Sequence, residues 1–391
     1  MKRLAIITTH PIQYNAPLFR LLHERKNIEI KIFYTWSQTA QGTKYDPGFK
    51  KQVEWDIPLL DGYPYTFVEN ISASPGSAHN KGIDNPTLVK EVEAWNPSAV
   101  LVYGWNFKSH LAAMRYFHGK MPVIFRGDST LIDETPGIKK ILRRLYLRYI
   151  FRSVDLALYA GKANRDYFIA HGLKEDQLLF MPHAIDNRRF AKSDENIAAS
   201  KKLREALNIP ETSLIFLSAG KLEEKKQPGL LAEIFVRLAA KDTYLVIAGS
   251  GELEEKLHSL YGDNEHIRFT GFLNQQQMPA LYGACDVFVL PSKGPGETWG
   301  LAVNEAMAAG KAVLVSSACG AAADLVQNGV NGFVFEKNDR DAAEKYLRYF
   351  SDHRAAVKEM GRESELMIAN YNFMRDADAV ERAVEKTMKG V

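Results

Sequence analysis

The chain has 391 residues, of which 46% are hydrophobic and 25% charged, and its formal net charge is +3. This length predicts two or three domains with a sizeable core, and so small a charge gives no reason to expect nucleic acid as a partner. The two cysteines, Cys285 and Cys319, belong to no CxxC or Cys/His cluster, so neither a zinc site nor a disulfide framework is indicated. The apolar stretch 4–7 is too short for a signal peptide, and no apolar run approaches the roughly 18 residues that span a bilayer.

The first half of the chain alternates apolar runs with amphipathic stretches. We expect strands at 3–8, 28–34, 99–103, 122–125, 155–159 and 178–181, and helices at 17–24, 87–95, 108–117 and 138–151. Such alternation predicts βαβ units and a mostly parallel sheet. Residues 36–82 break the pattern with scattered Gly, Pro, Tyr and Lys, which predicts a long excursion of the kind that is often functional.

A second series of the same type follows a polar stretch, 183–200, which we interpret as the link between two domains. Its expected strands are 214–218, 244–248, 267–270, 286–290, 312–316 and 332–335. The sequence therefore predicts an α/β protein with two Rossmann-like domains, residues 1–190 and residues 191–373.

The segment 291–310 (PSKGPGETWGLAVNEAMAAG) carries the strongest functional signal. It lies between two expected strands and predicts a turn followed by a short helix, 300–309, which ends at Gly310. Ligands of parallel α/β sheets bind outside the carboxyl ends of the strands, and Glu297 is in the turn at that edge. Glu305 is in the helix among apolar residues, where a carboxylate is costly unless it is hydrogen-bonded. A ligand with paired hydroxyls would satisfy it.

Residues 297–310 (ETWGLAVNEAMAAG) resemble the signature of the retaining glycosyltransferases of family 4, which have the GT-B fold. The two glutamates have the family's spacing, and the resemblance also includes the Trp-Gly-Leu step, the Ala-rich helix and the preceding Pro-Ser. It covers 210–345 well and 1–190 more weakly. It implies two parallel sheets that face an interdomain cleft, and a C-terminal helix, 374–391, that crosses back to the first domain.

The resemblance also implies a nucleotide-sugar donor that is bound mainly by the second domain. Gly220, Lys221 and Lys226 stand at the positions of the family's Gly-Arg pair and the Lys that follows it. Lys221 departs from the pattern, because its ammonium is a point charge whereas the arginine of the family has a planar guanidinium. Backbone amides near Gly220 and the two ammonium groups would hold a diphosphate. The alternative is a solvated, charged loop, in which Lys225 blurs the assignment.

On the same resemblance, Glu305 would accept hydrogen bonds from the ribose diol and Glu297 would contact the donor sugar. The positive end of the helix that begins near Gly300 would stabilise the leaving diphosphate, with the amides of Leu301 and Ala302 as donors. The alternative for Glu305 is a surface glutamate on an amphipathic helix. The predicted catalytic residues are thus Glu297, Lys221 and Lys226.

Other segments match the family less well. Phe272 and Leu273 are candidate contacts of the nucleotide base. The Gly-Ser-Gly run 249–251 is more simply a structural turn. Residues 319–324 (CGAAAD) resemble a Gly-Gly-x-Pro-Glu loop but have alanines in place of the second Gly and the Pro, so no catalytic role is carried over.

The first domain departs further from the family. His10 and Gln13 follow the first strand, where they would face donor or acceptor, or else belong to a capped turn. Arg126 and Asp128 are the nearest polar residues at the position where relatives often carry a His. The mechanism proposed for the family uses the leaving phosphate as the base for the acceptor, so a missing His need not abolish activity.

Residues 137–152 are basic and aromatic, with six Lys and Arg that we expect mainly on one side of a helix. Such a helix fits the surface of an anionic membrane, and the alternative is a core-packing helix with a solvated basic face. We expect a cytoplasmic protein; because many members of the family use lipid-linked acceptors, contact of 137–152 with the inner membrane surface stays open beside the core-packing alternative.

The predicted function is transfer of a sugar, with retention, from a UDP- or GDP-linked donor to a hydroxyl of a carbohydrate or lipid-linked acceptor. The expected pathway is polysaccharide, lipopolysaccharide or other glycoconjugate synthesis. No metal, cofactor or nucleic acid is expected. The alternatives are a GT-B sugar-nucleotide epimerase and a relative that binds nucleotide or carbohydrate but has lost catalysis.

Overall fold

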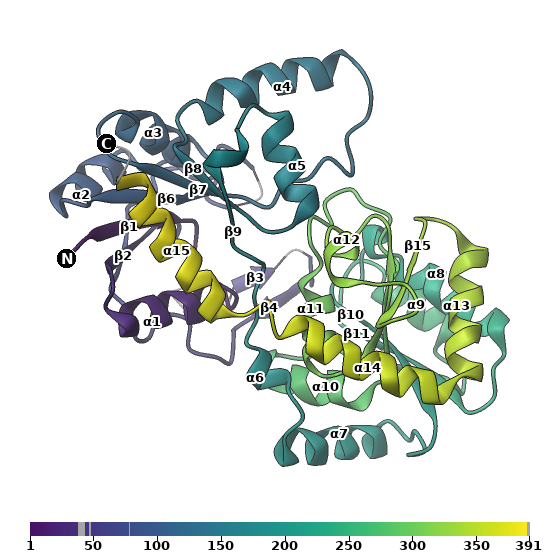
Figure 1. Ribbon diagram of the computed structural model, residues 1–391. Helices are drawn as coiled ribbons and strands as arrows, with labels where there is room; N and C mark the ends of the chain where they lie inside the picture. The colour runs from purple at the N-terminus through teal and green to yellow at the C-terminus, as the bar shows by residue number, and fades with distance from the viewer. Residues whose placement is uncertain (38–43, 47, 78, 389–391) are drawn as a thin grey trace. The chain divides into compact units, whose positions relative to one another are not determined.

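The computed structural model in Figure 1 describes residues 1–37, 44–46, 48–77 and 79–388. The chain forms two compact units. Unit 1 contains the described residues of Met1–Lys44, Pro58–His183 and Phe373–Val391, and unit 2 contains those of Tyr45–Ile57 and Ala184–Asn372. Residues 38–43, 47 and 78 of the expected excursion, and 389–391 of the expected C-terminal helix, lie outside the described residues.

Unit 1 is built on a parallel sheet with the strand order β5-β2-β1-β6-β7-β8-β9. Its strands are β1 (Arg3–Thr8), β2 (Glu29–Tyr34), β5 (Tyr65–Phe67), β6 (Ala99–Tyr103), β7 (Val123–Arg126), β8 (Leu156–Tyr159) and β9 (Leu178–Phe180). The central strands are almost continuously apolar because helices cover both faces of a parallel sheet. The neighbours β1 and β6 mark the point where the strand order reverses.

The helices of unit 1 are α1 (Ala16–Arg25), α2 (Leu88–Ala94), α3 (Lys108–Phe117), α4 (Ile138–Phe151), α5 (Lys162–Ala170) and α15 (Phe373–Met388). One core cluster joins one face of the sheet to α1 and α15, through residues such as Phe19 and Val380. The opposite core cluster joins the other face to α2, α3, α4 and α5, through residues such as Phe117, Phe151 and Phe168.

Unit 2 has a parallel sheet with the order β12-β11-β10-β13-β14-β15. Its strands are β10 (Leu214–Ala219), β11 (Thr243–Ala248), β12 (Ile267–Gly271), β13 (Val287–Leu290), β14 (Ala312–Ser316) and β15 (Gly332–Phe335). The order reverses between β10 and β13, which is where a doubly wound sheet opens a crevice at its carboxyl edge. A separate two-stranded sheet joins β3 (Lys44–Asp46) to β4 (Lys51–Val53).

The helices of unit 2 are α6 (Asn187–Phe190), α7 (Asp194–Ala206), α8 (Pro228–Leu238), α9 (Glu254–Tyr261), α10 (Met278–Ala284), α11 (Leu301–Ala308), α12 (Ala322–Leu325), α13 (Arg340–Asp352) and α14 (Arg354–Ile368). A core cluster joins one face of the sheet to α8, α9, α13 and α14. On the other face Tyr282 of α10 lies 5.7 Å from Phe288 of β13, ring centroid to ring centroid.

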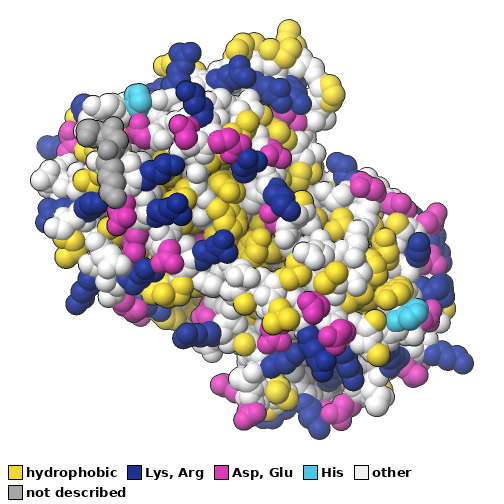
Figure 2. Space-filling view, viewed as in Figure 1, with side chains coloured by type: hydrophobic (Ala, Val, Ile, Leu, Met, Phe, Trp, Pro, Cys, Tyr) yellow, Lys and Arg dark blue, Asp and Glu magenta, His cyan; other side chains and the backbone are white. Residues whose placement is uncertain are grey.

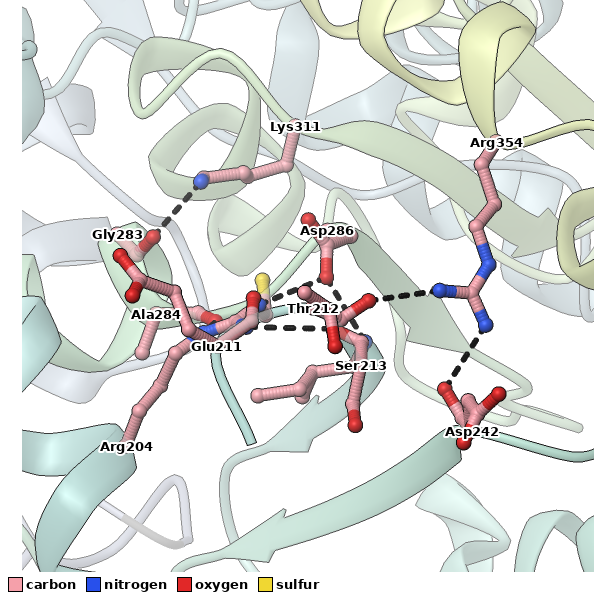
Figure 3. Close-up of polar contacts among 12 residues, drawn as sticks. Arg204, Glu211, Thr212, Ser213, Asp242, Gly283, Ala284, Asp286, Lys311 and Arg354 are labelled. Atoms are coloured by element: carbon pink, nitrogen blue, oxygen red, sulfur yellow. Dashed lines mark hydrogen bonds and ion pairs between the residues drawn. The ribbon is translucent and has the colours of Figure 1, made fainter. Parts of the chain in front are cut away.

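Polar contacts fix the amino ends of these strands (Figure 3). The Asp286 carboxylate, just before β13, accepts hydrogen bonds from the amide of Ile215 (2.8 Å) and from Arg204 (2.9 Å). Arg354 donates to the carbonyls of Thr212 (2.7 Å) and Asp242 (3.0 Å). Because charge-assisted bonds of this kind are strong, they hold three strand starts in register at the edge opposite the crevice.

The predicted α/β class and the predicted strands are confirmed, mostly to within one residue. Interpreting 183–200 as a linker was wrong from residue 187 onward, because α6 and α7 are helices of unit 2 that pack against α10. The expected excursion contains the short strands β3, β4 and β5, and its residues 45–57 belong to unit 2.

Candidate functional site

The loops that follow β10 and β13 meet where the strand order of unit 2 reverses. Lys221 and Lys226 lie on the first loop, and Glu297 lies on the second. The amide of Lys293 donates to the carbonyl of Lys225 (2.9 Å), so the two loops are hydrogen-bonded to each other. The structure therefore brings Lys226 to Glu297, two of the three residues that the sequence predicts as catalytic, and places Lys221 on the same loop as Lys226.

Lys226 and Glu297 are in direct contact. The Nζ of Lys226 lies 2.5 Å from the Oε2 of Glu297, and the hydroxyl of Ser292 donates to the same oxygen at 3.0 Å. The Glu297 side chain is 8% exposed. A buried carboxylate is tolerated when it is paired and hydrogen-bonded in this way, and a bound diphosphate would offer Lys226 a second anion at the same place.

Gly300 shapes the turn between Glu297 and α11. Its φ is +95°, and a Cβ at this position would lie 2.6 Å from the Sγ of Cys319. The thiol of Cys319 donates to the carbonyl of Trp299 (2.7 Å), and burial raises the pKa of this thiol to about 12, so it stays neutral. The loop 319–321, to which we gave no catalytic role, supports the turn: the amide of Gly320 donates to the carbonyl of Glu297 (3.0 Å).

Helix α11 begins directly at the turn. Its first amides, those of Leu301 and Ala302, belong to the N-terminal group that has no intrahelical acceptor. Glu305 lies on this helix and is 3% exposed, so the alternative of a solvent-exposed surface glutamate is wrong. The arrangement gives the crevice a positive helix end and a buried carboxylate.

The first loop is held by a close backbone contact. The amide of Gly220 donates to the carbonyl of Ala248 (3.0 Å), and a Cβ on Gly249 would lie 1.9 Å from the carbonyl oxygen of Gly220. A Cβ on Gly251 would lie 2.6 Å from the carbonyl oxygen of Leu222. These contacts explain the Gly-Ser-Gly run as packing, which confirms the structural interpretation made from the sequence.

Residues of segment 45–57, which no sequence pattern marks as part of the site, lie against the first loop. The carboxylate of Asp46 is 2.9 Å from the Nζ of Lys221. Burial alone would raise the pKa of Asp46, but the ammonium of Lys221 and the amides of Phe49 and Gly48 lower it overall. Asp46 therefore places a charged carboxylate on the lysine that was predicted to bind phosphate.

The same segment reaches the residues predicted to contact the base. The ring of Phe49 packs edge-on against Phe272, with centroids 5.0 Å apart, and the hydroxyl of Ser250 donates to the carbonyl of Phe49 (2.9 Å). Phe272 and Leu273 are half-buried at the end of β12. No local pattern in the sequence predicts this contact, because the partners are more than 200 residues apart.

In unit 1 the residues predicted after β1 lie at the carboxyl edge of the sheet. The ring of His10 packs edge-on against Trp36 at 5.1 Å, and its Nδ1 lies 2.9 Å from the hydroxyl of Thr9. Both His10 and Gln13 are partly exposed. The turn before α1 has no side-chain cap, so the capped-turn alternative is not supported at Asn15.

Arg126 and Asp128 have different surroundings. Arg126 is 5% exposed, and its guanidinium donates to the carbonyls of Leu158 (3.2 Å) and Pro182 (3.2 Å) and also to that of Met181. These contacts make Arg126 an anchor for β7, β8 and β9, so our prediction that it contacts substrate has no support in this geometry. Asp128 is exposed and lines a hollow of unit 1.

Neither a metal cluster nor a membrane span is found among the described residues. Three or more His, Cys, Asp or Glu side chains do not converge in this part of the chain. No described helix is long and apolar enough to cross a bilayer. The absence of a metal remains a prediction.

The comparisons with known proteins agree with this fold. Crystal structures of the Anabaena protein HepE with UDP and glucose share the fold: the TM-score is 0.69 at 16% identity, and all of both chains is covered. Two parallel α/β units of this kind define the GT-B architecture. Residues 199–367 match the family Glycosyl transferases group 1.

Curated relatives match over part of their length. An uncharacterized glycosyltransferase of Methanocaldococcus jannaschii is 31% identical over 244 residues, which are 60% of this chain and 61% of the relative. The GDP-mannose-dependent alpha-(1-6)-phosphatidylinositol monomannoside mannosyltransferase of Mycolicibacterium smegmatis is 28% identical over 208 residues, 51% of this chain and 53% of the relative. The chain thus spans about half to three-fifths of these relatives.

Proposed function

We propose that this protein is a retaining, metal-independent glycosyltransferase that uses a UDP- or GDP-linked sugar. The observation that carries the proposal is the meeting of Lys226 and Glu297 (2.5 Å) at the crevice of unit 2, beside the first turn of α11. A diphosphate there would gain two lysines and the positive end of a helix. The HepE complex with UDP and glucose and the GDP-mannose-dependent relative support a nucleotide-sugar donor.

The residues would share the chemistry as follows. Lys221, Lys226 and the amides of Leu301 and Ala302 would stabilise the charge that grows on the leaving diphosphate, which is usually the largest catalytic contribution. Glu297 would orient the donor sugar and Glu305 its ribose. The leaving diphosphate would take the proton of the acceptor hydroxyl as the new bond forms on the same face of the sugar.

The acceptor side of the proposal includes the surface of a membrane. On α4 the apolar residues Ile138, Ile141, Leu142, Leu145, Tyr146 and Tyr149 are 47–73% exposed. They recur at i, i+3, i+4, i+7, i+8 and i+11, so they form one outward stripe. Only Leu147, Ile150 and Phe151 of this helix are buried. Core packing therefore does not account for the exposed apolar stripe.

The basic residues of α4 indicate which kind of surface the apolar stripe would contact. Lys139, Arg143 and Arg148 are exposed on α4, whereas Lys140 lies 3.0 Å from the carboxylate of Glu134. Figure 2 shows yellow apolar and dark-blue basic side chains together over α4, along the upper edge of the view. An apolar stripe flanked by basic side chains suits an anionic bilayer surface. We propose a lipid-linked acceptor in glycoconjugate synthesis, in keeping with the phosphatidylinositol-named relative.

The proposal is tested by donor turnover in EDTA. UDP-glucose, UDP-galactose and GDP-mannose are each incubated with the protein and octyl β-glucoside, and NMR follows nucleoside diphosphate release and the anomeric proton of the product. We expect one donor to give the retained α-anomer, with a loss of about 100-fold in Lys226→Ala. Release of an inverted product, or no consumption of any donor, would contradict the proposal. Isomerisation of the donor without transfer would favour the epimerase alternative.

A further inference from the structure

Unit 1 contains two neighbouring hollows that the donor site does not use. A hollow of about 700 Å³ is lined by residues of 71–74 and 79–84 and by the loop 104–108 that follows β6, with Tyr146 of α4 also in its lining. A second, of about 460 Å³, is lined by Gly127 and Asp128 after β7. Trp105 and Asn106 line both. Both volumes are in the range of small-molecule sites, and both lie at the carboxyl edge of the sheet, where ligands bind in this class of fold.

The outer wall of the larger hollow is held in place by the side-chain amides of two asparagines, Asn70 and Asn85. Asn70 donates to the carbonyl of Gly82 (2.9 Å) and accepts from the amide of Asp84 (2.9 Å). Asn85, which is 5% exposed, donates to the carbonyls of Thr35 and Val68 (both 3.0 Å). A wall fixed by such contacts exists before any ligand arrives, so little ordering is lost on binding.

The lining combines aromatic rings with short polar groups. The rings of Trp105 and Tyr146 lie edge to face with centroids 6.0 Å apart, and Ser72, Asn80 and Asn106 add hydroxyl and amide groups. The ammonium of Lys108 lies 2.6 Å from the carboxylate of Asp84, so these two charges largely neutralise each other. Aromatic faces attract the weakly positive C–H groups of a sugar ring, while amides and hydroxyls match its OH groups.

We propose that the two hollows form an acceptor site for a saccharide of at least two units. One unit binds beside Asp128, and the next stacks against Trp105 and Tyr146. That the bound saccharide acts as an acceptor rests on the proposed transferase function, whereas its binding in the two hollows does not. Tyr146 also belongs to the outward apolar stripe of α4, so the lipid end of an amphiphilic acceptor would continue from the larger hollow onto that stripe.

Tryptophan NMR tests this inference directly. Labelling with ¹⁵N-tryptophan gives one indole signal for each of the five tryptophans, and Trp105→Phe assigns the signal of Trp105. The probes are glucose, galactose and mannose and the disaccharides maltose, cellobiose, lactose and mannobiose. We expect at least one disaccharide to shift the Trp105 signal, with a Kd about 5-fold or more below that of its monosaccharide, because only the disaccharide fills both hollows.

Two tyrosines of α4 provide a matched pair. Tyr146→Ala should weaken the disaccharide about 5-fold. Tyr149→Ala, at a residue that is 55% exposed and outside the lining of either hollow, should leave it unchanged. The inference is overturned if no probe shifts Trp105, if mono- and disaccharide bind equally, or if both variants behave alike. A UDP and GDP titration of the same sample separates the two proposals, because nucleotide binding without a Trp105 response refutes only the saccharide site.

Discussion

Asp46 and Lys221 form the contact that a nucleoside diphosphate would have to replace. Their charged atoms lie 2.9 Å apart, with side chains 25% and 35% exposed respectively. An ion pair with this exposure contributes at most about 1 kcal/mol. The Asp46 carboxylate thus occupies the ammonium group of Lys221, which we expect to bind the diphosphate of a ligand.

We predict that Asp46→Asn tightens nucleoside diphosphate binding by about 2- to 5-fold, because the ligand no longer competes with a carboxylate. Isothermal calorimetry measures the change. The matched control is Asp56→Asn, which alters the other end of the same segment, where Asp56 accepts from the amide of Gln276 (3.2 Å). Weaker binding in Asp46→Asn alone would mean that Asp46 positions Lys221 instead of blocking it.

Substitutions at Gly300 and Gly296 distinguish the backbone strain caused by an added Cβ from its steric contact with a neighbouring atom. Both have positive φ, +95° and +90°, but the added Cβ meets the Sγ of Cys319 at 2.6 Å in Gly300 and meets no atom within 4 Å in Gly296. We predict that Gly296→Ala costs about 1 kcal/mol through backbone strain alone, and that Gly300→Ala costs about 2–3 kcal/mol. Urea unfolding measures both, and equal losses would show that the contact with Cys319 relaxes freely.

At the scale of an element, α4 is stable without burying its apolar stripe. We predict that Leu142→Glu combined with Leu145→Glu abolishes binding to vesicles that contain anionic lipid, because the stripe loses its apolar character. Thermal stability should not fall, since these side chains are 60% and 58% exposed. Vesicle flotation gives the readout, and Leu260→Glu on α9, at a residue 61% exposed, is the control. Unchanged flotation of the double variant would exclude α4 as the contact.

Helix α15 carries a buried acid against the sheet of unit 1. Burial raises the pKa of Asp376 to about 8, although Arg126 and Arg375 oppose the shift. Among the described residues its Oδ1 has no hydrogen-bond partner. An unfolded Asp has a pKa of about 3.9, so the folded state keeps a proton that the unfolded state releases between these values. The free energy of unfolding therefore falls as the pH rises from about 4 to about 8.

We predict that Asp376→Asn removes this dependence. The variant should exceed the wild type in stability by about 1 kcal/mol or more at pH 8.5, with a smaller advantage at pH 5. Thermal unfolding at the two pH values measures the difference. Asp378→Asn on the same helix, whose side chain is 64% exposed, serves as the control, and a parallel shift in both variants would contradict the assignment.

For the whole molecule, the strands of the two sheets were predicted better from the sequence than the helices and loops around them. Strands such as β6 and β14 are buried on both faces, and their apolar runs fixed both type and bounds. Helix α7 was missed because it buries only Ser200 and shows no apolar period. Its cap, where the hydroxyl of Ser193 accepts from the amide of Asn196 (3.2 Å), and the bond from Arg204 to the carbonyl of Ala284 (2.8 Å) help to hold it.

The candidate site was likewise predictable only in part. Lys221, Lys226, Glu297 and Glu305 follow strands in a spacing that a sequence records. The contact of Asp46 with Lys221 spans 175 residues and depends on where segment 45–57 lies, for which no local pattern exists. The surroundings of Arg126 could not be predicted, because the sequence shows its place at the end of an apolar strand but not the carbonyls that enclose its guanidinium.

The central claim is that the loops after β10 and β13 bind a nucleoside diphosphate without metal. Calorimetric titration with UDP, GDP, ADP, dTDP and CMP in the presence of EDTA tests it most directly. We predict that one nucleoside diphosphate binds and that Lys226→Ala raises its Kd by about 10-fold or more. Glu305→Ala should remove the contribution of the ribose hydroxyls to the affinity. Binding of none of the five, or equal binding by wild type and both variants, would contradict the account.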